Sequence, residues 1–160
     1  MASRLTVGVV SDTHGLVRPE AKEALRGSDV ILHAGDIGGN HVLQELGEIA
    51  PVIPVRGNVD GGWARLLPER RRLDLGGVPV LILHDRGLLG LDPAADGVGI
   101  VVFGHSHQPL AEKRQGVLWF NPGSAGPRRL RLPVSVGRLV IEDGRAKAVM
   151  KYLAGKGVAG

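Results

Sequence analysis

The sequence predicts an α/β protein in which two β-sheets pack face to face, with helices on the outside. Up to about residue 60, short apolar runs alternate with helical segments, which is the pattern of a sheet with crossover helices. Beyond that point, apolar runs are separated mainly by short turns such as Gly76-Gly77 and Asp143-Gly144, which is typical of hairpins. A chain of 160 residues can bury one core of ordinary size, so we expect a single domain over residues 1–153.

The first half of the chain should alternate strand and helix. Apolar runs rich in Val and Ile predict buried strands at 5–10, 30–34 and 51–56. A helix should begin at Pro19 and end before Gly27, because proline suits the first helical turn and glycine the position after the last. Asn40 should cap a second helix, whose apolar face is made of Val42, Leu43, Leu46, Ile49 and Ala50.

The second half should consist mostly of strands. Apolar runs and turn residues predict them at 73–75, 78–83, 100–103, 110–114, 117–120, 134–141 and 146–153. A short helix is expected at 92–96. The last residues, 154–160, read AGKGVAG and predict a disordered tail, since terminal segments of small residues are rarely tied down.

Composition excludes several classes of protein. The chain has no cysteine, which excludes disulfides, thiolate zinc sites and cysteine nucleophiles. Its longest apolar run, 98–104, is too short to span a bilayer, and no signal peptide is recognisable, so we expect a cytoplasmic protein without membrane contact. The net charge of +4 leaves an anionic small molecule or nucleic acid open as substrate. Aromatic residues make up only 3%, so a nucleic-acid substrate is not favoured.

The run Arg70-Arg71-Arg72 is expected to be a solvated surface.

Polar side chains that can bind a metal follow five of the predicted strands. These residues are Asp12 and His14, Asp36, Asn58, His84, and His105 and His107. The carboxyl ends of strands form the ligand-binding edge of an α/β sheet, so we expect these side chains to gather there. Carboxylate, imidazole and amide groups are oxygen and nitrogen ligands that suit Mn, Fe, Zn, Ni or Co. Each short block alone could be an ordinary turn, and the specificity comes from the set and its order.

The set of blocks resembles the calcineurin-like metallophosphoesterase superfamily, and in particular its small YfcE-type phosphodiesterase branch. The matching blocks are Asp12-Thr13-His14, Gly35-Asp36, Gly57-Asn58, His84, Gly104-His105-Ser106-His107 and Asn121-Pro122-Gly123-Ser124. The resemblance extends from Leu5 to about Leu153. It implies a β-sandwich flanked by helices in four layers, in agreement with the fold that the strand pattern predicts.

The resemblance also implies roles for the individual residues. Two divalent metal ions are expected, manganese first, with nickel, iron, zinc and cobalt as alternatives. Asp12, His14 and His107 should hold the first metal, and Asn58, His84 and His105 the second. Asp36 should bridge the two ions and, with Asn58 and His105, form the catalytic set. A hydroxide between the metals would then attack the phosphorus of a small phosphodiester in line with the leaving oxygen.

The chain departs from the family pattern at two positions. Many larger members have a histidine after the Gly-Asn block that assists the leaving group, and here Val59 stands in its place. Asp85 occupies a position where the family usually has glycine; it could approach the second metal or point to solvent.

Other polar residues have plainer roles. His33 should be a satisfied core histidine, and Asp60 could orient a metal-bound histidine. Asn121 and Ser124 form a turn that could support the metal ligands.

Non-catalytic function is the main alternative. Some proteins of this fold are scaffolds or interaction proteins, among them a retromer subunit whose metal site is degraded. Here every ligand position is occupied by a residue that can bind a metal, which favours an enzyme.

Overall fold

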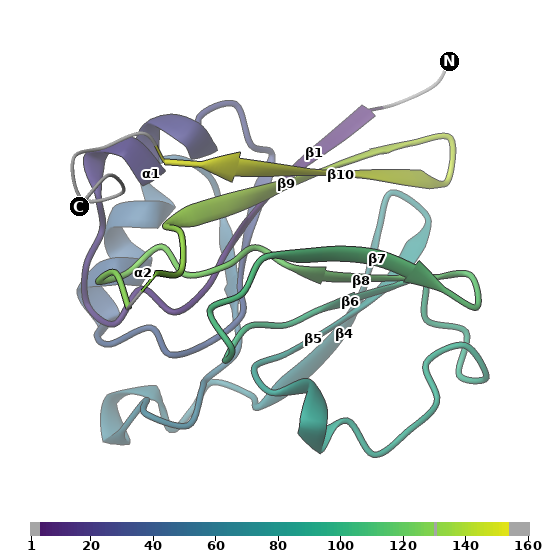
Figure 1. Cartoon of the computed structure of the whole chain (residues 1–160), viewed down its shortest axis with the longest axis horizontal. Coiled ribbons are helices and arrows are strands. Elements are labelled where there is room, and N and C mark those ends of the chain that lie inside the picture. The colour runs from purple at the N-terminus through teal and green to yellow at the C-terminus, as the bar shows by residue number, and fades with distance from the viewer. Residues whose placement is uncertain (1–3, 130, 154–160) are drawn as a thin grey trace.

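The computed structural model describes residues 4–129 and 131–153 and confirms the two-sheet α/β fold (Figure 1). The first sheet has five strands in the order β10-β9-β1-β2-β3, and the second has five in the order β4-β5-β6-β8-β7. The strands of the first sheet are β1 (Arg4–Val10), β2 (Val30–His33), β3 (Val52–Pro54), β9 (Ser135–Glu142) and β10 (Arg145–Tyr152). Those of the second are β4 (Arg70–Leu75), β5 (Val78–Leu83), β6 (Ile100–Val102), β7 (Leu110–Arg114) and β8 (Val117–Asn121).

Each sheet combines three parallel strands with two antiparallel ones, which lie on one side of the parallel strands in the first sheet and on both sides in the second. In the first sheet, β1, β2 and β3 run parallel, and the hairpin of β9 and β10 joins β1 antiparallel. In the second sheet, β5, β6 and β8 run parallel, with β4 and β7 antiparallel at either edge. The parallel strands of each sheet therefore deliver their carboxyl ends to one edge.

The main core lies between the two sheets. Alternate residues of β1, Val7 and Val9, are fully buried there with Val80 and Ile82 of β5 and with Phe120 of β8. This period of two explains why Val10 packs instead with the helices. The apolar faces of the sheets thus fix the scaffold, and the loops at the sheet edges are free to carry polar side chains.

Two helices, α1 (Pro19–Leu25) and α2 (Asn40–Gly47), cover the outer face of the first sheet (Figure 1). The first begins at proline as predicted. The prediction that Asn40 caps the second is wrong, because Gly39 is the N-cap and Asn40 is the first helical residue. Glycine has no side chain to accept a hydrogen bond, so no side-chain cap forms.

The outer face of the second sheet packs against Leu89, Leu91 and Val98, which follow the short 3₁₀ helix η2 (Arg86–Leu88). The helix expected at 92–96 is absent, since these residues form turns. The side chain of Asp92 accepts a hydrogen bond from the backbone of Ala94, and the backbone of Asp96 donates to the carbonyl of Asp92, but Gly97, with a φ of 75°, ends the segment after this single turn. A second 3₁₀ helix, η1 (Gly62–Ala64), lies between β3 and β4 and was not anticipated.

The described residues end at Leu153, whose backbone N–H donates to Val134. The predicted disordered tail at 154–160 lies outside the described residues, and the single-domain boundary stays a prediction. Within the described part of the chain, no helix is long and apolar enough to cross a membrane.

Candidate metal centre

The predicted ligands sit on loops that leave the carboxyl ends of parallel strands from both sheets. Asp12 and His14 follow β1, Asp36 follows β2, Asn58 follows β3, His84 follows β5, and His105 and His107 follow β6. Backbone hydrogen bonds tie these loops together. His14 donates to the carbonyl of Asp36 at 3.0 Å, and Gly104 donates to that of His84 at 2.9 Å.

Many of these ligands have a left-handed backbone. Asp12, His14, Asp36, His105 and His107 have φ angles between 47° and 72°. The only other described non-glycine residues with positive φ are Gln115 and Asp143, which occupy the turns of two hairpins. Such backbone costs roughly 1–3 kcal/mol per residue, so the fold holds these ligand loops at the expense of stability.

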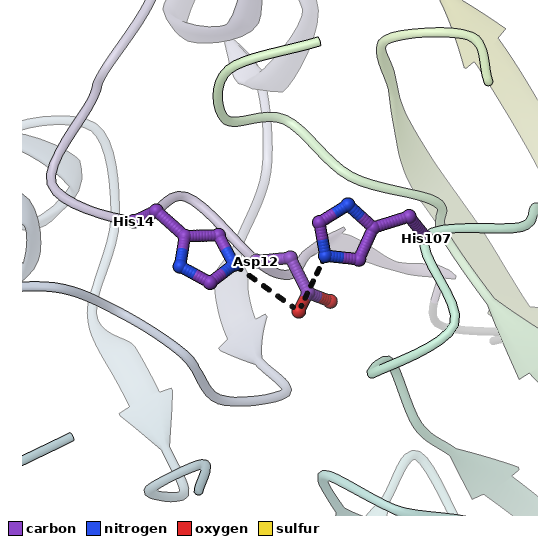
Figure 2. A group of neighbouring side chains, drawn as sticks. All are labelled: Asp12, His14 and His107. Carbon is purple, nitrogen blue, oxygen red and sulfur yellow. Dashed lines mark ion pairs between the residues drawn. The ribbon is translucent and has the colours of Figure 1, made fainter. Parts of the chain in front are cut away.

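Asp12 lies at the centre of the first group of ligands (Figure 2). Its Oδ1 is 3.3 Å from Nε2 of His107 and 3.7 Å from Nε2 of His14. The other oxygen, Oδ2, accepts hydrogen bonds from the Ser11 hydroxyl at 2.6 Å and from the backbone of His105 at 3.1 Å. The carboxylate is therefore fixed with Oδ1 turned toward the histidines.

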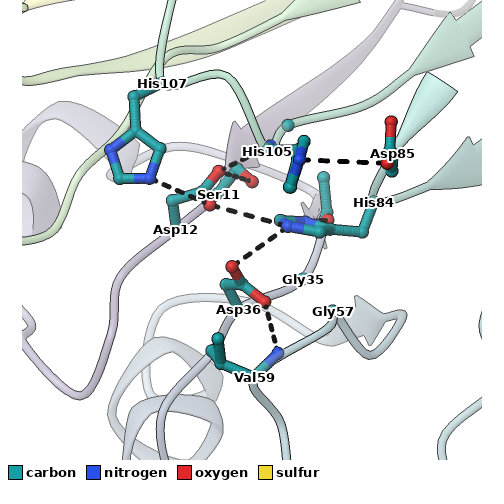
Figure 3. A network of polar contacts seen from close by, with 12 residues as sticks. Ser11, Asp12, Gly35, Asp36, Gly57, Val59, His84, Asp85, His105 and His107 are labelled. Atoms are coloured by element: carbon teal, nitrogen blue, oxygen red, sulfur yellow. Dashed lines mark hydrogen bonds and ion pairs between the residues drawn. The ribbon is translucent and has the colours of Figure 1, made fainter. Parts of the chain in front are cut away.

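Asp36 contacts one histidine from each predicted ligand set. Its Oδ2 is 3.1 Å from Nε2 of His84 (Figure 3). The same oxygen is 3.8 Å from Nε2 of His14. The backbone of Val59 donates to its Oδ1 at 3.1 Å. This is the arrangement that a carboxylate shared by two ions requires. Asp12 also approaches His84, with 3.8 Å between Oδ1 and Nε2, so both carboxylates lie between the two sets.

Asn58 and His105 lie along an adjoining cleft rather than in the central cluster. The cleft is lined by both residues and by His84. The rings of His84 and His105 meet edge to face, with centroids 5.2 Å apart. The structure thus brings Asp12, His14, Asp36, His84 and His107 into contact and places the remaining two beside them.

The electrostatics of the cluster favour charged carboxylates. Burial opposes ionisation of Asp12, but contacts with His107 and Ser11 outweigh it and lower the pKa of Asp12. Burial likewise opposes ionisation of Asp36, yet the contact with His84 and the Val59 N–H lower the pKa of Asp36. Burial opposes the charge on His84, but Asp36 and Asp12 prevail and raise the pKa of His84.

Four buried polar atoms in the cluster test whether a metal fits. Asp12 Oδ1, His14 Nε2, His84 Nε2 and His107 Nδ1 have no hydrogen-bond partner within the described part of the chain. Buried polar atoms are rarely left unsatisfied in native proteins. The four residues belong to the two groups whose ligand atoms lie within 4.8 Å of one another, namely Asp12, His14 and His107, and Asp12, Asp36 and His84. Nitrogen and oxygen donors so arranged fit divalent cations of the first transition series.

A hydrogen-bond chain through His33 fastens two of the ligand loops, and the prediction of a core histidine is confirmed. His33 is fully buried, and burial lowers the pKa of its imidazole to about 4, so the ring is neutral. Its Nδ1 accepts from the backbone of Gly35, which assigns the proton to Nε2. Nε2 then donates to the Thr13 hydroxyl, which donates to the carbonyl of Ile37. The sequence offered no signal for this role of Thr13.

Asp60 supports the loops and not a histidine. Its carboxylate accepts from the backbone N–H groups of Ile37, Gly38 and Gly57 at 2.8–3.1 Å. The interpretation of Asp60 as a partner of a metal-bound histidine is therefore wrong. No signal in the sequence indicates these contacts, because the side chain of Asp60 reaches back to Gly57 and across to the loop after β2.

Asn121 and Ser124 hold ligand loops through the backbone. Asn121 Nδ2 donates to the carbonyl of Gly104 at 3.1 Å, and the Ser124 hydroxyl donates to that of Asp12 at 3.1 Å. The turn between them therefore supports the loops that carry Asp12 and His105, as predicted.

The Arg70–Arg72 run lies on the surface, and the prediction of a solvated run is confirmed, since all three residues are exposed. Arg70 also donates to the carbonyls of Leu88 and Leu89, and Arg72 donates to that of Asp96. Two of the three exposed guanidinium groups therefore fasten the loop over the second sheet as well as facing solvent.

Comparisons with known proteins identify the family of the chain. A probable metallophosphoesterase of Methanothermobacter thermautotrophicus is 35% identical over 144 residues, covering 81% of this chain and 82% of the relative. Phosphodiesterase YfcE of Escherichia coli is 33% identical over 114 residues, 61% of this chain and 58% of YfcE. The crystal structure of Vps29 complexed with Zn²⁺ from Entamoeba histolytica has the same fold, with a TM-score of 0.71, 23% identity and coverage of 93% and 99%. The family model of the calcineurin-like phosphoesterase superfamily domain matches residues 5–144. The resemblance drawn from the metal-binding blocks is thereby confirmed, and the chain belongs to the calcineurin-like phosphoesterase superfamily.

Proposed function

We propose that the protein is a phosphodiesterase that acts with two divalent metal ions, manganese first among them. The observation that carries this proposal is the position of Asp36, whose carboxylate contacts His14 of one ligand set and His84 of the other. Asp12, His14 and His107 would hold the first ion, and Asn58, His84 and His105 the second, with Asp36 between them. When bound, such a pair supplies an activated hydroxide for in-line attack and charge to stabilise the phosphoryl oxygens.

The chain's own groups prepare the site for this reaction. Ser11 and the backbone of His105 hold one oxygen of Asp12, which leaves the other oxygen for the histidines. His84 donates through Nδ1 to the carbonyl of Ala34 at 2.8 Å, so its Nε2 faces the two carboxylates. Asp12 and His84 are thus oriented before any ion binds, and little reorganisation of these two ligands is needed afterwards.

The alternatives have less support. A scaffold function gains weight only from the shared fold of Vps29, and such a likeness carries no activity. A nucleic-acid substrate has less support because aromatic residues, which stack on bases, make up only 3% of the chain. The cytoplasmic location stays a prediction.

Metal content provides the first test. Protein loaded with Mn²⁺ and freed of excess should contain about two ions per chain, because the ligand groups are sufficient for a pair. The measurement is elemental analysis, with hydrolysis of bis-p-nitrophenyl phosphate followed in parallel. A chelator should abolish turnover, and added Mn²⁺ should restore it. A protein that binds no metal and cleaves no ester would support the scaffold interpretation instead.

Substrate class provides the second test, and it rests on Val59. General acid help to a leaving group is worth roughly 10²–10⁴-fold in rate, and valine cannot give it. We therefore expect a higher kcat/KM for a bis-aryl diester than for the matching aryl monoester. Residue 59 lies beside Asp36 and its side chain is 54% exposed, so a larger group fits.

The variant Val59→His separates this explanation from a donor elsewhere in the site. It should gain activity on esters with poor leaving groups and change little on activated aryl diesters, measured with the same metal and pH. A wild-type protein that prefers the monoester would refute the argument from Val59 and leave the two-metal assignment intact.

A further inference from the structure

Asp85 stands next to one predicted ligand, His84, and faces another, His105 (Figure 3). Its Oδ1 accepts a hydrogen bond from the backbone of Gly87 at 2.9 Å and so caps η2. Its Oδ2 is 3.8 Å from Nε2 of His105. One oxygen is therefore engaged in the fold, and the other is directed at the imidazole.

His105 needs an orienting partner more than the other ligands do. Its side chain is 48% exposed, whereas that of His84 is 5% exposed and is fixed by the carbonyl of Ala34. A neutral imidazole carries its proton on one nitrogen and offers a lone pair on the other. A metal-binding histidine commonly donates the proton of its second nitrogen to a carboxylate, and this contact sets the nitrogen that binds the metal.

We propose that Asp85 is a positioning residue that accepts a hydrogen bond from Nε2–H of His105 and thereby reserves Nδ1 for the second metal. This inference rests on the proposed function. For this hydrogen bond, the distance between Asp85 Oδ2 and His105 Nε2 has to shorten from 3.8 Å to about 2.9 Å. The side chain of His105 is half exposed, so its ring has room to turn toward Asp85.

The variant Asp85→Asn separates the effect of Asp85 on His105 from its capping of η2. Its single carbonyl oxygen can still accept from Gly87, so the cap and the fold are kept. Its NH₂ group then points at Nε2 of His105 and favours the opposite tautomer, with the proton on Nδ1. The matched control is Asp92→Asn, because Asp92 makes the same kind of local contact, to Ala94 at 3.1 Å, without facing a predicted ligand.

The probe is Mn²⁺ alone, titrated into the full chain with free Mn²⁺ followed by electron paramagnetic resonance. The wild type and Asp92→Asn should each bind two ions, and the affinity of each ion should be the same in both proteins. Asp85→Asn should bind one ion as before and the other about 10–100-fold more weakly, the usual loss when an outer partner of a metal ligand is removed. Unchanged binding of both ions would overturn the role of Asp85 and leave the phosphodiesterase standing. A wild type that binds no Mn²⁺ would overturn both.

A second readout does not depend on metal. Nitrogen-15 NMR of the metal-free protein reports the tautomer of each imidazole, and the His105→Gln variant assigns the signal. The wild type should carry the His105 proton on Nε2, and Asp85→Asn should move it to Nδ1. A wild-type ring protonated on Nδ1 would refute the proposal, whatever the thermal stability of the variants.

Discussion

Replacing Asp36 by asparagine should lower kcat/KM for a phosphodiester by about 10³-fold, the scale seen when a preorganised electrostatic group is removed from an active site. The change keeps the size of the side chain and its contact with the Val59 N–H, but it removes the negative charge between His14 and His84. Two dications repel strongly without that charge, so the variant should also bind fewer ions. The melting temperature should shift by only a few degrees, because Asp36 lies on a loop at the sheet edge.

The matched control for this experiment is Asp143→Asn. Asp143 has the same φ of 55° as Asp36, but it occupies the exposed turn between β9 and β10. Asparagine tolerates the left-handed backbone at both positions. The control should retain full activity and metal content. Near-normal turnover by Asp36→Asn would mean that the bridging carboxylate lies elsewhere, with Asp12 as the remaining candidate.

Replacing Gly57 by alanine should remove activity by a different route. A Cβ at this position would overlap the carboxylate and the backbone nitrogen of Asp36. The overlap is partly with backbone, which cannot rotate away as a flexible side chain can. The loop after β3 must therefore move, and with it Asn58. Overpacking of this kind costs about 1–3 kcal/mol, which corresponds to a melting temperature roughly 2–12 °C lower.

Gly61→Ala is the control for Gly57→Ala. Gly61 lies on the same loop, and a Cβ there meets no heavy atom within 4 Å among the described residues. Differential scanning calorimetry and Mn²⁺ titration of both variants should show a loss of stability and of metal affinity for Gly57→Ala only. Equal behaviour of the two would show that the loops after β2 and β3 are not packed as tightly as the structure has them.

Much of the fold and of the candidate site could be predicted from local signals. Val-rich runs identified the strands, and the polar residues after them located the site, because parallel strands have to end at a common edge. Turn chemistry identified the hairpin at Asp143-Gly144, where the chain does reverse. These features depend on residues close together in the sequence.

Features that depend on contacts between distant loops could not be predicted. The role of Asp60 depends on backbone groups that only the packed loops bring near it. The approach of Asp12 to His84 joins the two sheets, and no spacing in the sequence encodes that distance. The orientation of Asp85 likewise follows from the 3₁₀ helix that it caps.

The left-handed ligand loops also have a consequence for how such a protein can change over generations. Glycine at positions such as His14 or His107 would relieve backbone strain of roughly 1–3 kcal/mol. The core between the sheets does not depend on these side chains. Under the proposed function, a lineage that no longer needed the reaction would therefore gain stability as it lost its ligands one by one. In that case the requirement for metal binding, and not the requirement for folding, accounts for this set of residues.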